Sequence, residues 1–294
     1  MAAAVEEAAR FLAARSADRI ALSDVAEHVG YSPFHLARSF EARLGIPPGR
    51  FLGAHRFQLA KRLLLAGDER VVDVCHAAGF DSLGTFTTRF AAAVGASPGQ
   101  FRRLPEVLAG ARPGPVSVPG PAPGGGAVSG SVSLAQRAGR ALGPAPSIYV
   151  GLFTRRLAGG PPVAGARMVG GGPFLLAGVP PGSYWLLGAA LAVGGDARSQ
   201  LVPERQVVGG WPGPIQVGGG GTLWGADLRL DLAEDWLTPV VVALPVLGTP
   251  LSPTQQDRRS GGPPVGPTVP GEGPAPAASR LPPARTDQSW RDHR

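Results

Sequence analysis

The sequence predicts a multidomain protein: an all-α region, then an all-β, sandwich-like region, with irregular segments between and after them. Three observations support this. A helix-turn-helix pattern occurs twice in the first third, and later apolar runs are short and separated by Gly- and Pro-rich turns. Gly (44) and Pro (32) make up about a quarter of the 294 residues. We expect a helical domain at 1–105, a flexible linker at 106–127, a β-sandwich domain at 128–247 and a disordered tail at 248–294.

The clearest helix-turn-helix pattern lies at 71–103. Its first part carries apolar side chains at i, i+3, i+4 and i+7, which gives one face of a short helix: Val71, Val74, Cys75 and Ala78. Gly79 ends this helix, since glycine tolerates the left-handed C-cap conformation. Asp81 or Ser82 caps a second helix that runs to about Val94. Helix, tight turn, helix is the arrangement whose second helix lies in the DNA major groove.

The same pattern occurs earlier, at 22–52. Val25-Ala26 and Gly30-Tyr31 correspond to Val74-Cys75 and Gly79-Phe80, and then Leu36, Phe40, Gly45, Pro48 and Phe51 correspond to Phe86, Phe90, Gly95, Pro98 and Phe101. The period is about 50 residues, and two copies predict a paired module. We call 22–52 the first repeat and 71–103 the second repeat.

Local signals set the ends of the helices in the first repeat. Ser23 or Asp24 caps its first helix, because their side-chain oxygens accept free N–H groups of the first turn. Ser32 caps the second helix, and Pro33 suits its first turn.

Three further helices complete the helical domain: an opening helix at 5–15, a connecting helix from about Pro48 to Ala66, and a short closing helix at about Pro98–Arg103. The connecting helix spans about 27 Å, which is comparable to the roughly 34 Å of one DNA turn. Lys61 and Arg62 lie on this connecting helix. Its predicted apolar face consists of Phe51, Leu52, His55, Leu59, Leu63 and Leu64.

The later part of the chain predicts strands. They are expected at Val128–Leu134, Ser147–Phe153, Phe174–Val179, Ser183–Val193, Val207–Val208, Ile215–Val217 and Thr222–Leu232. Pro180-Pro181-Gly182 separates two of them and predicts a hairpin-like pair.

Gly79–Phe90 reads G-F-D-S-x-x-x-F-x-x-x-F, and Gly95–Arg102 reads G-x-S-P-x-x-F-R. With the duplication, these motifs resemble the AraC/XylS family of bacterial transcription regulators over roughly residues 5–104. The resemblance implies a seven-helix domain in which two helix-turn-helix units, joined by one long helix, enter successive major grooves. It implies double-stranded DNA as a partner and RNA polymerase as a further one.

Gly172–Leu186 resembles a repeat of carboxypeptidase-regulatory-like, transthyretin-like β-sandwiches, in which the tyrosine after the Pro-Gly turn packs in the core. The resemblance rests mostly on this one segment. A small-molecule or protein effector at the β-sandwich is the corresponding expectation.

We call the second helix of each repeat its recognition helix. In the first recognition helix, the predicted DNA-binding residues are Ser32, Pro33, Phe34, Ala37 and Arg38. Arg38 is the candidate for base readout, since a guanidinium pairs bidentately with guanine; the alternative is a solvated charge. Phe34 either packs on a thymine methyl group or fills a surface groove.

In the second recognition helix, the predicted DNA-binding residues are Ser82, Leu83, Gly84, Thr85, Thr88 and Arg89. The sequence departs from the family here. Thr88 stands where Arg is common, and Ala91-Ala92 replaces the usual basic pair. Phosphate anchoring by this helix is therefore expected to be weaker, with Arg89 compensating in part.

Composition excludes several classes of protein. Net charge is +7, from 28 Lys/Arg against 21 Asp/Glu, which is compatible with DNA contact. The single cysteine, Cys75, fits a reducing cytosol; it is either a small buried hydrophobe or a redox-sensing thiol.

No histidines lie at metal-ligand spacing, and no phosphate loop or nucleophile elbow occurs, so we expect no metal, no cofactor and no enzyme. An acidic N-terminus without a transmembrane run predicts a cytoplasmic protein.

The sequence therefore predicts a sequence-specific DNA-binding transcription regulator. The alternative is an interaction or scaffold protein whose β-sandwich binds a protein or a carbohydrate and whose helix-turn-helix pair no longer reads DNA specifically. Because the linker offers no apolar face, few contacts should cross the domain boundary. Residues 1–105 are then expected to fold and to bind DNA alone, as a monomer.

Overall fold

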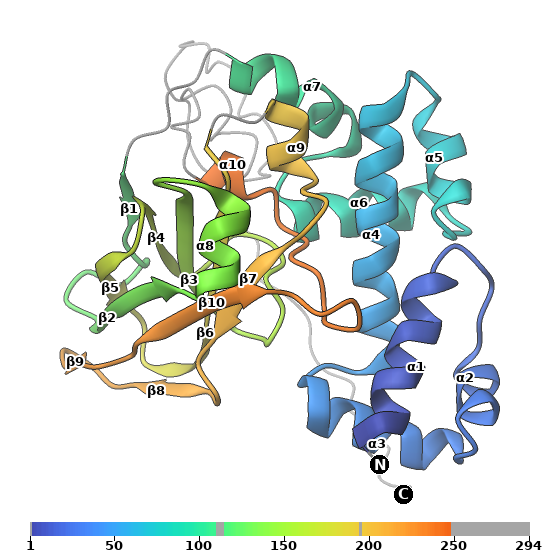
Figure 1. Cartoon of the computed structure of the whole chain (residues 1–294), viewed down its shortest axis with the longest axis horizontal. Coiled ribbons are helices and arrows are strands. Elements are labelled where there is room, and N and C mark those ends of the chain that lie inside the picture. Colours follow the sequence, from blue (N-terminus) through green and yellow to red (C-terminus); the bar gives the residue numbers. More distant parts are fainter. Residues whose placement is uncertain (1, 110–114, 194–195, 248–294) are drawn as a thin grey trace, which may run out of the picture. The chain divides into compact units, whose positions relative to one another are not determined.

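The computed structural model describes residues 2–109, 115–193 and 196–247, all of which belong to one structural unit. A helical region (2–109) is followed by a strand-rich region (115–247) (Figure 1). The tail expected to be disordered, 248–294, lies outside the described residues. No helix in the described part of the chain combines the length and the apolar content needed to cross a membrane.

Seven helices lie within residues 2–109. They are α1 (Ala2–Ala14), α2 (Leu22–His28), α3 (Pro33–Leu44), α4 (Pro48–Ala66), α5 (Val71–Ala77), α6 (Leu83–Val94) and α7 (Pro98–Ala109). The first repeat holds α2 and α3, the second holds α5 and α6, and α4 connects them (Figure 1). Helix α7 runs past the expected end at Arg103, because Leu104 and Leu108 pack on the core of the second repeat.

The two recognition helices have matching ends. Ser32 Oγ accepts the His35 N–H at 3.3 Å, and Ser82 Oγ accepts the Thr85 N–H at 3.4 Å, so both predicted serine caps are present. Gly45 and Gly95, with φ of 74° and 88°, end α3 and α6 in the left-handed conformation.

The expected cap of α2 takes a different form. The helix begins at Leu22 with Ala21 as the N-cap residue, and the Ala21 N–H donates to Asp24 Oδ2 at 2.9 Å. Asp24 therefore reaches back from the third helical position, and Ser23 is not the cap. A carboxylate inside the first turn satisfies a free N–H as effectively as an N-cap side chain does.

Helix α4 is buried on more sides than its predicted apolar face suggests. Leu59 and Leu63, expected to point inward, are only partly buried. Gln58 and Lys61 are 5% and 1% exposed, although the sequence presents them as polar positions. The buried α4 side chains in the helical cores are Phe51 and Leu52 in the first repeat and Ala54, Phe57, Ala60, Leu64 and Leu65 in the second, and Leu59 and Leu63 pack against the second core.

The strand-rich region contains ten strands among its described residues. They are β1 (Val116–Val118), β2 (Gly126–Leu134), β3 (Ser147–Phe153), β4 (Ala164–Val169), β5 (Gly172–Val179), β6 (Gly182–Leu191), β7 (Val207–Gly210), β8 (Ile215–Val217), β9 (Thr222–Leu223) and β10 (Leu228–Leu232). Three short helices accompany them: α8 (Gln136–Leu142), α9 (Ala197–Leu201) and α10 (Leu244–Leu247).

The strands form one curled sheet in the order β1-β4-β3-β6-β7-β10-β2-β5, with β8 paired to β6 and β9 paired to β2. The hairpin expected around Pro180-Pro181-Gly182 is wrong. Strand β5 pairs with β2, whereas β6 pairs with β3, β7 and β8. The turn reverses the chain, but it delivers β6 to the middle of the sheet, where both of its edges find partners.

Several predicted boundaries also change. The flexible linker at 106–127 is wrong in part, because Val116–Val118 pairs antiparallel with β4 and the Gly120 N–H donates to the Ala177 carbonyl. The single strand expected at Thr222–Leu232 is two strands, divided by Gly225 with φ of 77°. Strand β4 and helices α8 and α9 have no counterpart in the prediction.

The core of the strand-rich region lies on the inner face of the curled sheet. It includes Val128, Ile148, Leu176, Leu186 and Leu230. Tyr184, the tyrosine after the Pro-Gly turn, is 7% exposed as expected, and its hydroxyl donates to the Pro180 carbonyl at 3.0 Å. A buried tyrosine thus keeps a partner for its polar end.

The expectation that few contacts cross from the helical region to the strand-rich region is wrong. Leu201, Val241 and Ala243 belong to the same buried cluster as the second repeat. Gln58 Nε2 donates to the Val240 carbonyl, and Lys61 Nζ donates to the Val241 carbonyl at 3.4 Å. Residues far downstream of the predicted linker supply these contacts.

Candidate DNA-binding surface

Each recognition helix has a buried face and an exposed face because its apolar residues recur every four positions. Leu36, Phe40 and Leu44 point inward from α3, and Phe86, Phe90 and Val94 point inward from α6. The second core is rich in aromatic rings: the Phe90 ring centroid lies 5.4, 5.8 and 5.9 Å from those of Phe86, Phe101 and Phe57. These contacts fix which side of each helix faces solvent.

The predicted DNA-binding residues lie on the exposed sides. Ala37 is partly buried, and the other ten are exposed: Ser32, Pro33, Phe34, Arg38, Ser82, Leu83, Gly84, Thr85, Thr88 and Arg89. The structure therefore brings them together as two sets, one on each repeat. Each set extends from the N-cap serine to the middle of its helix. It includes the first turn, which is the part of a recognition helix that contacts base edges.

Phe34 and Arg38 form a pair on α3. The Phe34 side chain is 72% exposed, and the Arg38 guanidinium carbon lies 5.7 Å from its ring centroid. A guanidinium over an aromatic face is attracted by the ring quadrupole. Phe34 thus fills no groove in the described part of its own chain, and Arg38 packs over its ring.

Arg89 lies differently from Arg38. A Cβ atom added to Gly53 of α4 would lie 3.7 Å from Arg89 Nη2, so this guanidinium leans over the connecting helix. It faces another cation there, because Arg89 is among the charges that lower the pKa of Arg56. Because Arg89 lies over α4, helix α6 presents less positive charge on its own exposed side than the presence of an arginine in its sequence suggests.

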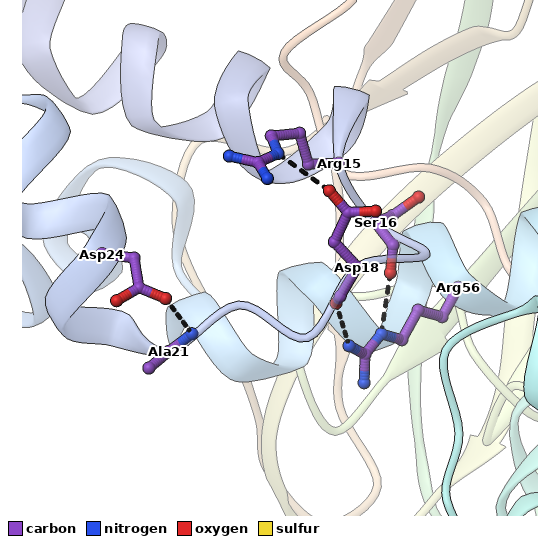
Figure 2. Close-up of polar contacts among 6 residues, drawn as sticks. All are labelled: Arg15, Ser16, Asp18, Ala21, Asp24 and Arg56. Atoms are coloured by element: carbon purple, nitrogen blue, oxygen red, sulfur yellow. Dashed lines mark hydrogen bonds and ion pairs between the residues drawn. The ribbon is translucent and has the colours of Figure 1, made fainter.

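Arg56 joins the loop between α1 and α2 to the second repeat, and the sequence does not predict this role. Figure 2 shows its guanidinium beneath the loop between α1 and α2, where Nε donates to the Ser16 carbonyl and Nη2 donates to the Asp18 carbonyl, both at 2.8 Å. Its guanidinium carbon also lies 5.8 Å from the Phe80 ring centroid in the second repeat. Burial is the main cause that lowers the pKa of Arg56 from its ordinary value.

A second link between this loop and the second repeat is an exposed ion pair. Arg19 Nη2 lies 2.7 Å from Asp81 Oδ1, with the two side chains 88% and 75% exposed. Solvent screens such a pair, so we assign it little stability. It leaves Ser82 alone as the cap of α6, which resolves the two alternatives for that helix.

Arg56→Met is expected to lower the free energy of unfolding by about 2 kcal/mol, because it removes two charge-assisted hydrogen bonds while keeping the apolar stem over Phe80. Urea unfolding of the full chain measures this. Arg19→Met is the matched control, with an expected change below about 0.5 kcal/mol. Equal losses in the two variants would contradict the role of Arg56 as a link.

Cys75 is a buried hydrophobe in this structure. Its side chain is fully buried, and Sγ lies 3.7 Å from the Phe80 carbonyl oxygen. Burial, followed by the charge of Asp81, raises the pKa of the Cys75 thiol, which lowers the thiolate fraction that redox chemistry needs. Among the residues that the structure describes, no group of three or more His, Cys, Asp or Glu side chains forms a metal site.

The helical region is similar in sequence to known proteins. Residues 25–104 match a family model described as "Helix-turn-helix domain". The chain is 35% identical over 85 residues to the HTH-type transcriptional activator AarP of Providencia stuartii, covering 29% of this chain and 63% of that protein. It is 37% identical over 83 residues to an uncharacterized HTH-type transcriptional regulator, YfiF, of Bacillus subtilis (strain 168), covering 28% of this chain and 26% of that one.

Among solved structures, the C-terminal domain of AraT, a response regulator from Geobacillus stearothermophilus, is 31% identical and covers 34% of this chain and 84% of that chain, with a TM-score of 0.33. The DNA-binding domain of AdpA, in complex with a target DNA, is 24% identical and covers 36% of this chain and 93% of that chain, again with a TM-score of 0.33. The matches to the curated relatives span less than two thirds of each relative's length. Residues 25–104 therefore match a helix-turn-helix domain, and a strand-rich curled sheet follows it.

Proposed function

We propose that this protein is a sequence-specific DNA-binding transcription regulator that inserts α3 and α6 into successive major grooves. One observation carries the proposal: two equivalent helices, each capped by serine and ended by glycine, expose their starts to solvent on either side of α4. The curated relatives are an activator and a regulator by name, and the family model matches residues 25–104, which carry both helices.

Selection of binding sites from random DNA with the full chain tests the proposal. The expected result is an enriched motif with two half-sites about one helical turn, roughly 10 base pairs, apart. Selection at moderate salt is needed, because phosphate contacts alone give sequence-independent binding that weakens as salt rises. Absence of any enriched motif would contradict the proposal.

Arg38→Ala is expected to weaken binding to the selected site by about 1–3 kcal/mol and to relax the preference at one base pair, because it removes a guanidinium that pairs with guanine. Binding titrations against the site and its single-base variants measure both effects. Arg140→Ala, which removes an exposed arginine from α8, is the control and should leave the base preference unchanged. Equal effects of the two variants would show that Arg38 contributes net charge alone.

The strand-rich region carries finer proposals. It is a sandwich of the carboxypeptidase-regulatory-like type that receives a small-molecule or protein effector, and the buried Tyr184 after the Pro-Gly turn supports this assignment. The regulator acts without enzymatic activity, in the cytoplasm, where DNA and RNA polymerase are its partners. Titration calorimetry with candidate effectors tests the first of these points.

The alternative function is an interaction protein that does not read DNA specifically. The observation in its favour is the character of α6, where Arg89 leans over α4 and Ala91 and Ala92 follow Phe90. This alternative predicts that site selection yields no motif and that binding to unrelated DNA sequences is equal.

A further inference from the structure

Two segments of the strand-rich region contact the helical region. The first is the loop between β3 and β4, residues 154–163, which we call the β3–β4 loop. The second is residues 236–243, which follow β10 and which we call the post-β10 segment. The N–H groups of Val241 and Val242 donate to the Ala158 carbonyl at 3.0 and 3.1 Å, so the two segments are tied together.

The β3–β4 loop donates a hydrogen bond to the same position in both repeats. Arg156 Nη1 donates to the Arg43 carbonyl at 3.5 Å, and the Gly160 N–H donates to the Ala93 carbonyl at 2.6 Å. Arg43 and Ala93 are equivalent, since each lies three residues after the aligned Phe40 and Phe90. The last carbonyls of a helix have no partner within the helix, and the loop supplies partners at the ends of both α3 and α6.

Apolar contacts repeat this double attachment. Leu157 of the β3–β4 loop packs against the cores of both repeats. In the post-β10 segment, Trp236 and Leu237 pack on the core of the first repeat, and Val241 and Ala243 belong to the core of the second. Each segment thus touches both helix-turn-helix units.

Polar side chains on one side of the connecting helix α4 attach it to the post-β10 segment. His55, Gln58 and Lys61 are spaced by three residues, so they lie on one side of α4. Gln58 and Lys61 donate to the carbonyls of Val240 and Val241, and His55 has a backbone hydrogen bond with Leu237. In addition, the Ala243 N–H donates to the Val94 carbonyl at 2.9 Å, at the end of α6.

We propose that the strand-rich region sets the relative position of the two recognition helices and so determines which half-site spacing the protein accepts. It holds the C-terminal ends of α3 and α6 and the helix between them, and it leaves their exposed starts free for DNA. A fixed separation admits half-sites one turn apart and excludes shifted ones, because each added base pair rotates a half-site by about 34°. This inference rests on the proposed function for its consequence on DNA but not for its structural content.

Gly160 provides a sharp test, and Gly170 provides its matched control. Both have a positive φ, 74° and 71°, so alanine imposes the same backbone strain at either position. A Cβ atom at Gly160 would lie 2.7 Å from the Ala92 carbonyl oxygen, whereas a Cβ atom at Gly170 has open space. Only Gly160→Ala therefore forces the β3–β4 loop away from α6.

The first measurement needs no DNA. Spin labels are attached at Phe34→Cys and Gly84→Cys in the full-length chain, and pulsed electron paramagnetic resonance then reports the distance between the starts of α3 and α6. The native cysteine is removed by Cys75→Ala, since the first repeat has alanine at the equivalent position. We expect a narrow distance distribution in this parent and with Gly170→Ala, and a broader or shifted one with Gly160→Ala. Equal distributions in all three, or broadening by both alanines, would overturn the inference.

The second measurement uses the unlabelled full chain and DNA duplexes whose half-sites differ by single inserted or deleted base pairs. The unmodified protein and Gly170→Ala should lose at least about tenfold in affinity away from the preferred spacing, and Gly160→Ala should lose less than about threefold. An unchanged spacing preference in Gly160→Ala would overturn the inference. If no duplex binds specifically, the proposed function fails, and the distance measurement still decides whether the strand-rich region positions the helices.

Discussion

Lys61→Met is expected to stabilise the protein at pH 7 by roughly 2–4 kcal/mol in the free energy of unfolding. The Lys61 side chain is 1% exposed, with Nζ 3.4 Å from the Val241 carbonyl oxygen and 5.8 Å from the Phe101 ring centroid. Burial, and then the charge of Arg62, lowers the pKa of Lys61 from 10.5 to about 7. Methionine fills a similar volume and does not have to give up a proton or bury a charge.

The sign of the pH dependence follows from proton binding. Between pH 7 and 10.5 the unfolded chain binds a proton at Lys61 that the folded chain releases, so this group makes stability rise with pH. Urea unfolding at pH 7 and pH 8.5 should show this rise in the unmodified protein and a smaller one in Lys61→Met. Arg103→Met, which removes an exposed cation from α7, is the control and should keep the original slope. An unchanged slope in Lys61→Met would show that Lys61 is solvated.

The second large effect is a loss of stability in mild acid caused by His55. This imidazole packs against Phe51 with ring centroids 4.5 Å apart and ring planes tilted by 44°, and its Nε2 atom is buried without a hydrogen-bond partner. Burial, and then Arg62, lowers the pKa of His55 from 6.5 to about 4. The unfolded chain therefore binds a proton in this range before the folded chain does, so stability falls as the pH drops from 6.5 towards 4.

The shift corresponds to roughly 2–3 kcal/mol in the free energy of unfolding across that range. His55→Leu should retain most of this stability at pH 4.5, and the comparison with the unmodified protein cancels the contribution of the carboxylates. His35→Leu, at an exposed position of α3, is the control and should follow the unmodified protein. Parallel acid transitions in all three proteins would assign the loss to other groups.

The sequence predicts the helical region well because its signals are local. Ser32, Gly45, Ser82 and Gly95 specify the ends of α3 and α6 within one turn of themselves, and the four-residue spacing of apolar side chains separates the inner and outer faces. The exposed sides of the recognition helices follow from that spacing alone. Arg56 was missed because its partners, the Ser16 and Asp18 carbonyls, lie in a loop without periodicity.

The remaining errors concern contacts between distant parts of the chain. The burial of Gln58 and Lys61 could not be predicted, since the carbonyls that receive their hydrogen bonds lie about 180 residues away. The turn at Pro180-Pro181-Gly182 specifies a reversal of the chain but not which strands pair afterwards, so β5 and β6 were joined wrongly. Pairing is decided by the whole sheet, and a short turn carries no information about it.

The order of strands has a consequence for how the protein folds during synthesis. The path β1-β4-β3-β6-β7 reaches β2-β5 through β10, which pairs antiparallel with β7 and parallel with β2. The sheet therefore stays in two pieces until Leu228–Leu232 has left the ribosome, whereas the helices, whose contacts are mostly local, can form as soon as they emerge. Residues 236–243 follow β10, so a newly made chain passes through a stage in which its recognition helices are folded and the post-β10 segment does not yet contact them.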